Sequence, residues 1–246
     1  MRVVISQSMY FPWVGFLEQI RLADVFVHYD DVQFSKGSFT NRVQIKASTG
    51  VTWMSVPLRD LRLGQVIDNV APAPVREWKN KHLDLLRRSF QGSMFGNDAI
   101  ALAESVLQFD YENIGALGRA SMKALIDYFG VGGSCQFLDA RALDIPGRSS
   151  QRVLDIVKAV GGTEYITGHG ASNYLDHDLF AANGIAVNYM AYEKFAYPQL
   201  HGEFTPYVSS LDLVANCGRG GARYICSETI SSKDFFQRAE TGAPSE

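Results

Sequence analysis

The chain has 246 residues, and its 23 Lys plus Arg stand against 26 Asp plus Glu, a formal net charge of -3. This balance lacks the positive field that a nucleic-acid backbone requires, so DNA and RNA are excluded as main partners. The hydrophobic fraction of 46% and the charged fraction of 20% exclude a disordered, collagen-like or coiled-coil chain. Three cysteines without paired spacing, together with the lack of a signal-type start or a membrane-length apolar run, predict a cytoplasmic protein with reduced thiols.

Short apolar strands alternate with helical periods, which predicts a parallel sheet. The first unit is a strand at Val3–Gln7, a helix at Trp13–Leu22 and a strand at Asp24–Tyr29. The same alternation returns near residue 135, and we expect both stretches to share one sheet. Its elements are a strand at Cys135–Leu138, a helix at Ser149–Val160, a strand at Glu164–Thr167, a helix at Leu175–Asn183 and a strand at Ile185–Tyr192.

Residues 42–130 break this alternation and predict an insert. A hairpin is expected there, followed by three helices near 75–91, 97–109 and 112–129. A later helix is expected to start near Ser209 and to end at Gly218. The chain is therefore expected to form a single α/β domain over residues 1–238, with a disordered tail at 239–246.

Ligands of open parallel sheets bind beyond the carboxyl ends of the strands, so the loops that follow the strands are the candidate sites. The loop after the first strand offers the polar Gln7 and the aromatic Tyr10 and Trp13. These rings either stack on a ligand or lock the loop against the core. Gly15 would let a ligand approach the backbone of the following helix.

The loop after the second strand concentrates charge. Tandem carboxylates at a strand end bind Mg²⁺ or sugar hydroxyls, hold nearby cations, or simply cap a turn. Cations beside carboxylates suit a phosphorylated and hydroxylated ligand, which makes a nucleotide-linked sugar the expected guest. The residues concerned are Asp30, Asp31, Lys36, Asn41 and Arg42.

The loop after the Glu164–Thr167 strand reads Gly168-His169-Gly170 and is a candidate phosphate cradle. His169 is either a general base, a donor to phosphate or a structural histidine. His201 lies in a proline- and glycine-bounded stretch that either closes the pocket or wraps the domain rigidly. The five histidines are scattered, and no metal-ligand spacing is present.

At these loops the sequence resembles the WbqC-like family, small bacterial proteins associated with O-antigen and other surface polysaccharides. This sequence has Ser8 where the family commonly has proline. A fainter likeness to pantothenate synthetase implies a Rossmann-like, nucleotidyltransferase-like sheet with helices on both faces. The WbqC resemblance is carried by Gln7, Tyr10-Phe11-Pro12-Trp13, Gly15, Asp30-Asp31-Val32-Gln33-Phe34, Lys36, Asn41, Arg42, Lys46, Val56-Pro57, Gly168-His169-Gly170, Tyr174-Leu175, Tyr197-Pro198-Gln199, Phe204, Pro206, Ser209, Asp212 and Asn216-Cys217-Gly218.

The resemblance implies modification of a nucleotide-linked sugar in polysaccharide assembly. We expect acyl or aminoacyl transfer to an amino sugar, with His169 and Asp31 as catalytic residues and the other loop residues as ligand-binding groups. The partners are then the nucleotide-linked sugar and an acyl or aminoacyl donor, with a homo-oligomer possible and the cofactor unknown. The alternatives are a non-catalytic nucleotide-sugar binding protein and an ATP-dependent nucleotidyltransferase or ligase.

Overall fold

The computed structural model describes residues 1–240, and residues 241–246 lie outside the described part. Its main sheet has the strand order β10-β9-β8-β1-β2-β7, in which only β10 runs antiparallel to its neighbour. Counted along the chain within this sheet, the order is the 3-2-1-4-5-6 order of a Rossmann fold. The strands are β1 (Arg2–Ser6), β2 (Val25–His28), β7 (Gln136–Asp139), β8 (Glu164–Thr167), β9 (Ala186–Met190) and β10 (Thr229–Ser231).

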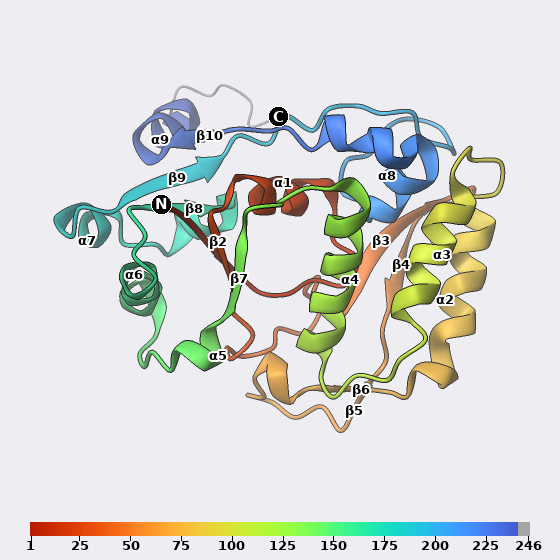
Figure 1. Cartoon of the computed structure of the whole chain (residues 1–246), viewed down its shortest axis with the longest axis horizontal. Helices are drawn as coiled ribbons and strands as arrows, with labels where there is room; N and C mark the ends of the chain where they lie inside the picture. Colours follow the sequence, from red (N-terminus) through yellow and green to blue (C-terminus); the bar gives the residue numbers. More distant parts are fainter. Residues whose placement is uncertain (241–246) are drawn as a thin grey trace.

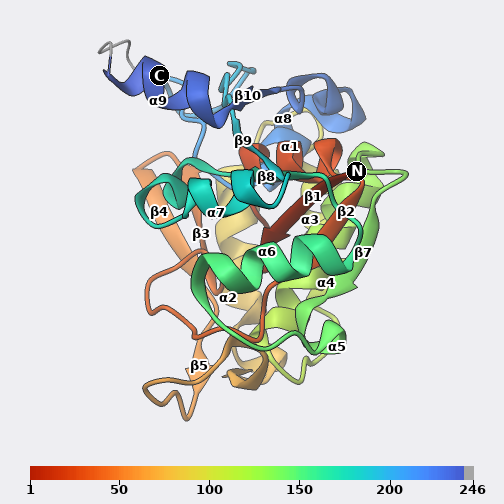
Figure 2. The ribbon, with the colours of Figure 1, turned by 90° about the vertical axis from the view of Figure 1, so that its left-hand side faces the viewer.

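Helices cover both faces of the sheet, which confirms the expected Rossmann-like α/β class. Successive side chains of β1 point to opposite faces, so Val4 packs into one hydrophobic cluster and Val3 into another. The face of Val4 is covered by α1 (Val14–Leu22), α4 (Ile114–Phe129) and α8 (Ser210–Cys217). The opposite face is covered by α6 (Ser149–Ala159) and α7 (His177–Ala182), and Figure 2 shows α6 lying across it.

The stretch between β2 and β7 holds the predicted hairpin and three helices, and it extends to one side of the sheet (Figure 1). Asn113 caps α4 by accepting a hydrogen bond from the Ala116 backbone N–H at 2.8 Å, and Gly130 ends that helix in the left-handed region at φ 66°. The elements preceding α4 are β3 (Arg42–Ala47), β4 (Gly50–Ser55), α2 (Val75–Ser89) and α3 (Gly96–Val106), with the unpredicted short pieces β5 (Leu58–Arg59), η1 (Ile67–Asn69) and β6 (Ala71–Pro72).

After β9 the chain crosses the molecule as an irregular segment, residues 191–208, which we call the strap. It leads into α8, whose predicted start is confirmed because the Ser209 side chain caps it. η3 (Gly218–Tyr224), β10 and α9 (Ser232–Glu240) follow, and the sequence did not indicate them. The predicted tail lies outside the described residues, apart from residues 239 and 240, which close α9.

Candidate functional site

A cleft of about 780 Å³ opens at the point where the strand order reverses, between β1 and β8. Switch points of this kind are where open α/β sheets bind ligands, and the volume suits a drug-sized molecule. We call it the switch-point cleft. It is lined by Ile5, Ser6, Gln7, Met9, Trp13, Phe16, Gln19, Tyr29, Phe39, Tyr165, Thr167, Gly168, His169, Gly170, Ala171, Tyr174, Tyr192, Lys194 and Tyr207.

Five of the sequence-predicted site residues meet in this cleft: Gln7, Trp13, Gly168, His169 and Gly170. The Gln7 side chain is half-buried and has no hydrogen-bond partner among residues 1–240. Gly170 is exposed, and a Cβ added there would meet no atom within 4 Å. The backbone at Gly170 is therefore open to an incoming ligand.

His169 starts η2 (His169–Asn173), directly after β8. Its Nε2 lies 2.6 Å from the carbonyl oxygen of Met190, at the end of β9. A carbonyl oxygen only accepts, so Nε2 carries the proton and Nδ1 of the neutral ring is the free acceptor. Within the described chain Nδ1 has no hydrogen-bond partner. This arrangement fixes the tautomer that a general base at Nδ1 requires.

A row of aromatic rings forms one wall of the cleft. Trp13 lies between Tyr192 and Tyr207, with centroid distances of 5.0 and 5.8 Å. Tyr192 contacts His169 at 5.1 Å, and His169 contacts Phe235 of α9 at 5.0 Å. Gln19 donates to the Tyr192 hydroxyl at 2.5 Å, and burial raises the pKa of that phenol. The row presents flat apolar faces and a few fixed polar atoms.

Gly15 has a different role from the one we expected. A Cβ at this position would lie 2.2 Å from the Trp13 ring, because that ring folds back over the first turn of α1. The space above Gly15 is thus filled by Trp13, and no ligand reaches the helix backbone there. Gly15 instead lets Trp13 take its place in the aromatic row.

The carboxylate of Asp30 does not face the switch-point cleft and is fully buried. It accepts from the Ser8 backbone N–H at 2.8 Å and from the Ser8 hydroxyl at 2.6 Å. Burial raises the pKa of Asp30, and these hydrogen bonds and Arg119 oppose that rise. A proline at position 8 would lose both bonds, so Ser8 and Asp30 form a pair in this chain.

Arg119 of α4 gathers three carboxylates beyond the ends of β2 and β7. It lies 2.6 Å from Asp68, 2.5 Å from Asp139 and 3.5 Å from Asp30. Burial lowers the pKa of Arg119, but the three aspartates hold it above its ordinary value. We call these four residues the Arg119 cluster. Its guanidinium occupies the place that a bound cation would take among the carboxylates.

His28 lies beside this cluster and contacts Ser8. The Ser8 hydroxyl gives its one proton to Asp30, so His28 Nδ1, 2.9 Å away, is the donor in that contact. Burial, with a contribution from Arg119, lowers the pKa of His28 to about 4. Ser8 is fully buried and bonds the carboxylate directly, so these three residues lack the serine-histidine-aspartate order of a hydrolase triad.

Asp31 and Arg42 were expected to face one cavity with His169, and the cleft does not include them. Asp31 forms a two-point ion pair with Arg152 of α6, which is 8% exposed. The Arg42 guanidinium lies over the Trp53 ring, 4.1 Å from its centroid, and donates to the Gly37 carbonyl. Asp31 is neutralised by Arg152, and Arg42 is held by Trp53 and Gly37, with its Nε buried and without a hydrogen-bond partner among residues 1–240. Neither side chain lines the cleft, so we correct their assignment to the site.

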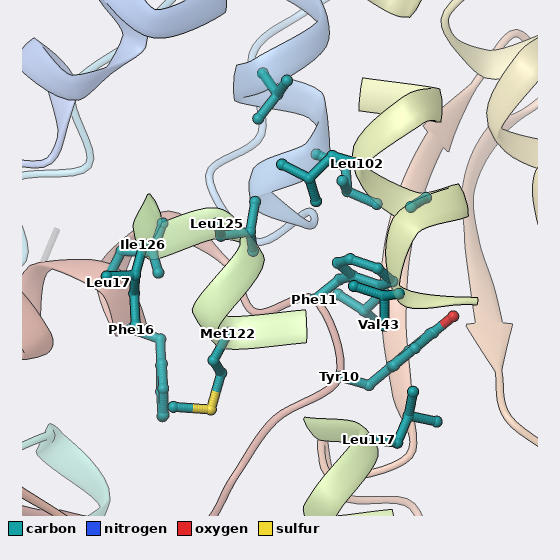
Figure 3. Close-up of a cluster of buried hydrophobic side chains, with 14 of the residues drawn as sticks. Tyr10, Phe11, Phe16, Leu17, Val43, Leu102, Leu117, Met122, Leu125 and Ile126 are labelled. Atoms are coloured by element: carbon teal, nitrogen blue, oxygen red, sulfur yellow. The ribbon is translucent and has the colours of Figure 1, made fainter. Parts of the chain in front are cut away.

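Four more predicted residues lie away from the cleft. Tyr10 is fully buried, its ring next to Phe11 between α4 and the β3–β4 hairpin (Figure 3), which leaves no face for a ligand to stack on. The Asn41 side chain donates to the Val56 carbonyl at 3.0 Å and closes the hairpin. His201 bonds the Ser89 carbonyl at the end of α2, and Lys36 is exposed outside the cleft lining.

A buried polar network fixes the strap, which brings Lys194 and Tyr207 to the cleft. Lys46 is 4% exposed, and its Nζ donates to Gln199 Oε1 and to the Gly202 carbonyl at 3.0 Å each. Burial raises the pKa of Asp212, on α8, to about 6, although Tyr197 and Gln199 hydrogen-bond to it. Lys46, Gln199 and Asp212, which are among the residues that resemble the WbqC-like family, therefore hold the strap in place.

Sequence reasoning missed Lys194, Gln19 and Tyr207, and it named Tyr192 only as a strand end. The same strand-end rule, applied two residues beyond Tyr192, would have indicated Lys194. Gln19 carries no such signal, because it lies within α1 and reaches the cleft through the packing of that helix.

No group of three or more His, Cys, Asp or Glu among residues 1–240 is placed to hold a metal ion. In the same part of the chain, no helix has the length and apolar character needed to cross a membrane.

The chain is 29% identical over 228 residues to the uncharacterized protein Rv1507c of Mycobacterium tuberculosis, which covers 91% of this chain and 97% of that protein. No solved structure matches. The model of the WbqC-like protein family matches residues 7–224, a span that holds every residue of the cleft except Ile5 and Ser6. The chain belongs to the WbqC-like protein family.

Proposed function

We propose that the switch-point cleft binds a nucleotide-linked amino sugar, and that His169 is the general base for transfer of an acyl or aminoacyl group to its amine. The observation that carries this proposal is His169 itself, which lines a cleft at the switch point with its Nε2 fixed on the Met190 carbonyl. The aromatic row supplies flat faces for a base or sugar ring. Gln7 and Thr167 supply polar atoms for hydroxyls.

The transfer step places His169 Nδ1 next to the amine. The amine nitrogen forms a bond to the carbonyl carbon of an activated acyl donor, and Nδ1 accepts the proton that the nitrogen loses. The bond from that carbon to the leaving group breaks with its electron pair, and the leaving group takes the proton back from Nδ1. Asp31 has no part in this scheme, since Arg152 holds it on α6.

The test starts from binding. Thermal shift with UDP-, GDP- and dTDP-linked amino sugars identifies the ligand, because a ligand that binds the folded state raises the melting temperature. The ligand is then incubated with acyl thioesters, or with ATP and amino acids, and its amine is followed by mass spectrometry. His169→Gln, which keeps a donor for the Met190 carbonyl, should bind the sugar and lose about 100-fold or more in turnover.

Each outcome separates the alternatives. Unchanged turnover in His169→Gln would remove the base assignment. Binding without product from any donor would favour a binding module, and release of pyrophosphate from ATP with the sugar as acceptor would favour adenylyl transfer. Absence of a shift with every nucleotide sugar would contradict the proposal as a whole.

A further inference from the structure

The side chains that line the switch-point cleft do not balance positive with negative charge. Among its lining residues Lys194 is the one Lys or Arg, and there is no Asp or Glu. The two cations that the sequence favoured for phosphate lie elsewhere, since Arg42 is held by Trp53 and Gly37, and Lys36 is outside the lining. An anion that enters the cleft therefore meets a single positive side chain and no carboxylate on its walls.

The ammonium group of Lys194 is uncommitted in the described chain. No carboxylate of residues 1–240 forms an ion pair with it, and its Nζ lies 5.7 Å from the centroid of the Tyr207 ring. The half-buried side chain thus lies beside the Tyr207 ring and carries a charge that no acidic side chain of the described residues pairs with. A lysine with free donors next to an aromatic wall suits the oxygens of a phosphate.

The backbone at Lys194 is also unusual. Its φ is 50°, in the left-handed region that side chains other than glycine rarely adopt. The backbone next to it is held by the Glu193 N–H, which donates to Ser227 Oγ at 3.0 Å. A glycine would adopt this backbone conformation with less strain, yet this position holds a lysine. Strain of this kind is typical of residues held for binding.

We propose that Lys194 binds the phosphates of a nucleoside diphosphate whose base or sugar lies against the aromatic row. This assignment rests on the proposed function and makes it specific, because it places the phosphate contact on the strap and not in the loops after β2 and β8, where the sequence suggested cations and a phosphate cradle. The ligand then runs from Lys194 and Tyr207 toward His169, along the row formed by Tyr207, Trp13, Tyr192 and His169.

The test measures affinity for a nucleoside, its monophosphate and its diphosphate, in the uridine, guanosine and thymidine series, by calorimetry. Lys194→Met should lower the affinity for the diphosphate about tenfold or more and change the affinity for the nucleoside less than twofold. Lys194→Arg should keep the diphosphate affinity within about threefold, because the charge remains. Lys36→Met is the matched control and should bind every probe like the unaltered protein.

A further substitution at Lys194 separates an effect on binding from an effect on stability. Lys194→Gly relieves the left-handed backbone, so its melting temperature without ligand should equal or exceed that of the unaltered protein, while its diphosphate affinity falls as in Lys194→Met. A merely structural lysine would lower the melting temperature in Lys194→Met and weaken nucleoside and diphosphate equally, which would overturn the assignment.

Two further results would also decide against it. If the unaltered protein binds nucleotides and Lys194→Met binds the diphosphate equally well, the phosphate assignment fails and the proposed function stands. If the unaltered protein binds no nucleotide of any series, the proposed function and this assignment both fail.

Discussion

Two regions lie at the carboxyl edge of the same sheet. The switch-point cleft beside β1 and β8 has an aromatic wall, one lysine and no carboxylate. The Arg119 cluster beside β2 and β7 has three carboxylates closed around one guanidinium. The region richest in charge is the one whose charges satisfy each other, and the region with few charges has groups without partners. The charged residues at the ends of β2 and β7 therefore pair with each other and do not line the cleft.

The largest expected effect comes from substituting Arg119, the cation of the Arg119 cluster. Arg119→Ala leaves Asp30 buried without its cation and Asp68 with only Arg141, 3.4 Å away, so the free energy of unfolding should fall by about 3–5 kcal/mol, as measured by urea denaturation. Lys123→Ala is the control on the same helix, where an exposed pair with Asp127 contributes about 0.5 kcal/mol or less. Equal losses of unfolding free energy in the two variants would mean that the Arg119 cluster does not stabilise the fold.

The strap offers a second test through its dependence on pH. Burial raises the pKa of Asp212 from 3.8 to about 6, so its stabilising protonation in the folded state is complete below about 3.8 and is lost as the pH rises through 6. Between pH 4.5 and 7 the unaltered protein should lose about 2 kcal/mol of unfolding free energy that Asp212→Asn does not lose. Parallel pH profiles for the two proteins would contradict this, and the exposed Asp127→Asn should follow the unaltered protein.

The smallest expected effects come from substituting two glycines, Gly15 next to Trp13 and Gly170 in the cleft lining. Gly15→Ala collides with Trp13 and should lower the free energy of unfolding by roughly 1–2 kcal/mol. Gly170→Ala meets no neighbouring atom, so it should change stability by about 0.5 kcal/mol or less and act only on ligand affinity. Thermal melts and the nucleotide titrations distinguish the two effects, and a destabilised Gly170→Ala would show that its backbone has a structural role.

Much of the fold could be predicted from the sequence because its strands and helices carry local signals. The β8 strand has its predicted bounds, and α6 ends at Ala159, one residue before the predicted end at Val160. β10 and α9 escaped prediction since β10 has three residues and owes its pairing to β9, far earlier in the chain. Pairing between distant segments leaves no periodic trace in a short sequence window.

Less of the site was predictable. The strand-end rule predicted that Gln7 and His169 lie at one edge of the sheet, where both line the cleft, because the rule depends only on where parallel strands stop. It failed for Asp30 and Asp31 because their partners, Arg119 and Arg152, are 89 and 121 residues downstream. Nothing near the two aspartates in the sequence shows that a guanidinium arrives to neutralise them. Tyr10 failed for a related reason, since the insert that buries its ring follows it in the chain.

The place of β1 in the sheet also sets the order of events during synthesis. β1 ends at Ser6, whereas β8, one of its two neighbours in the sheet, begins at Glu164. A ribosome must therefore add more than 150 residues before that edge of β1 is covered, and the nascent chain carries an unpaired apolar strand until then. The switch-point cleft needs both strands and the strap, so it cannot be complete before residues 191–208 have been made.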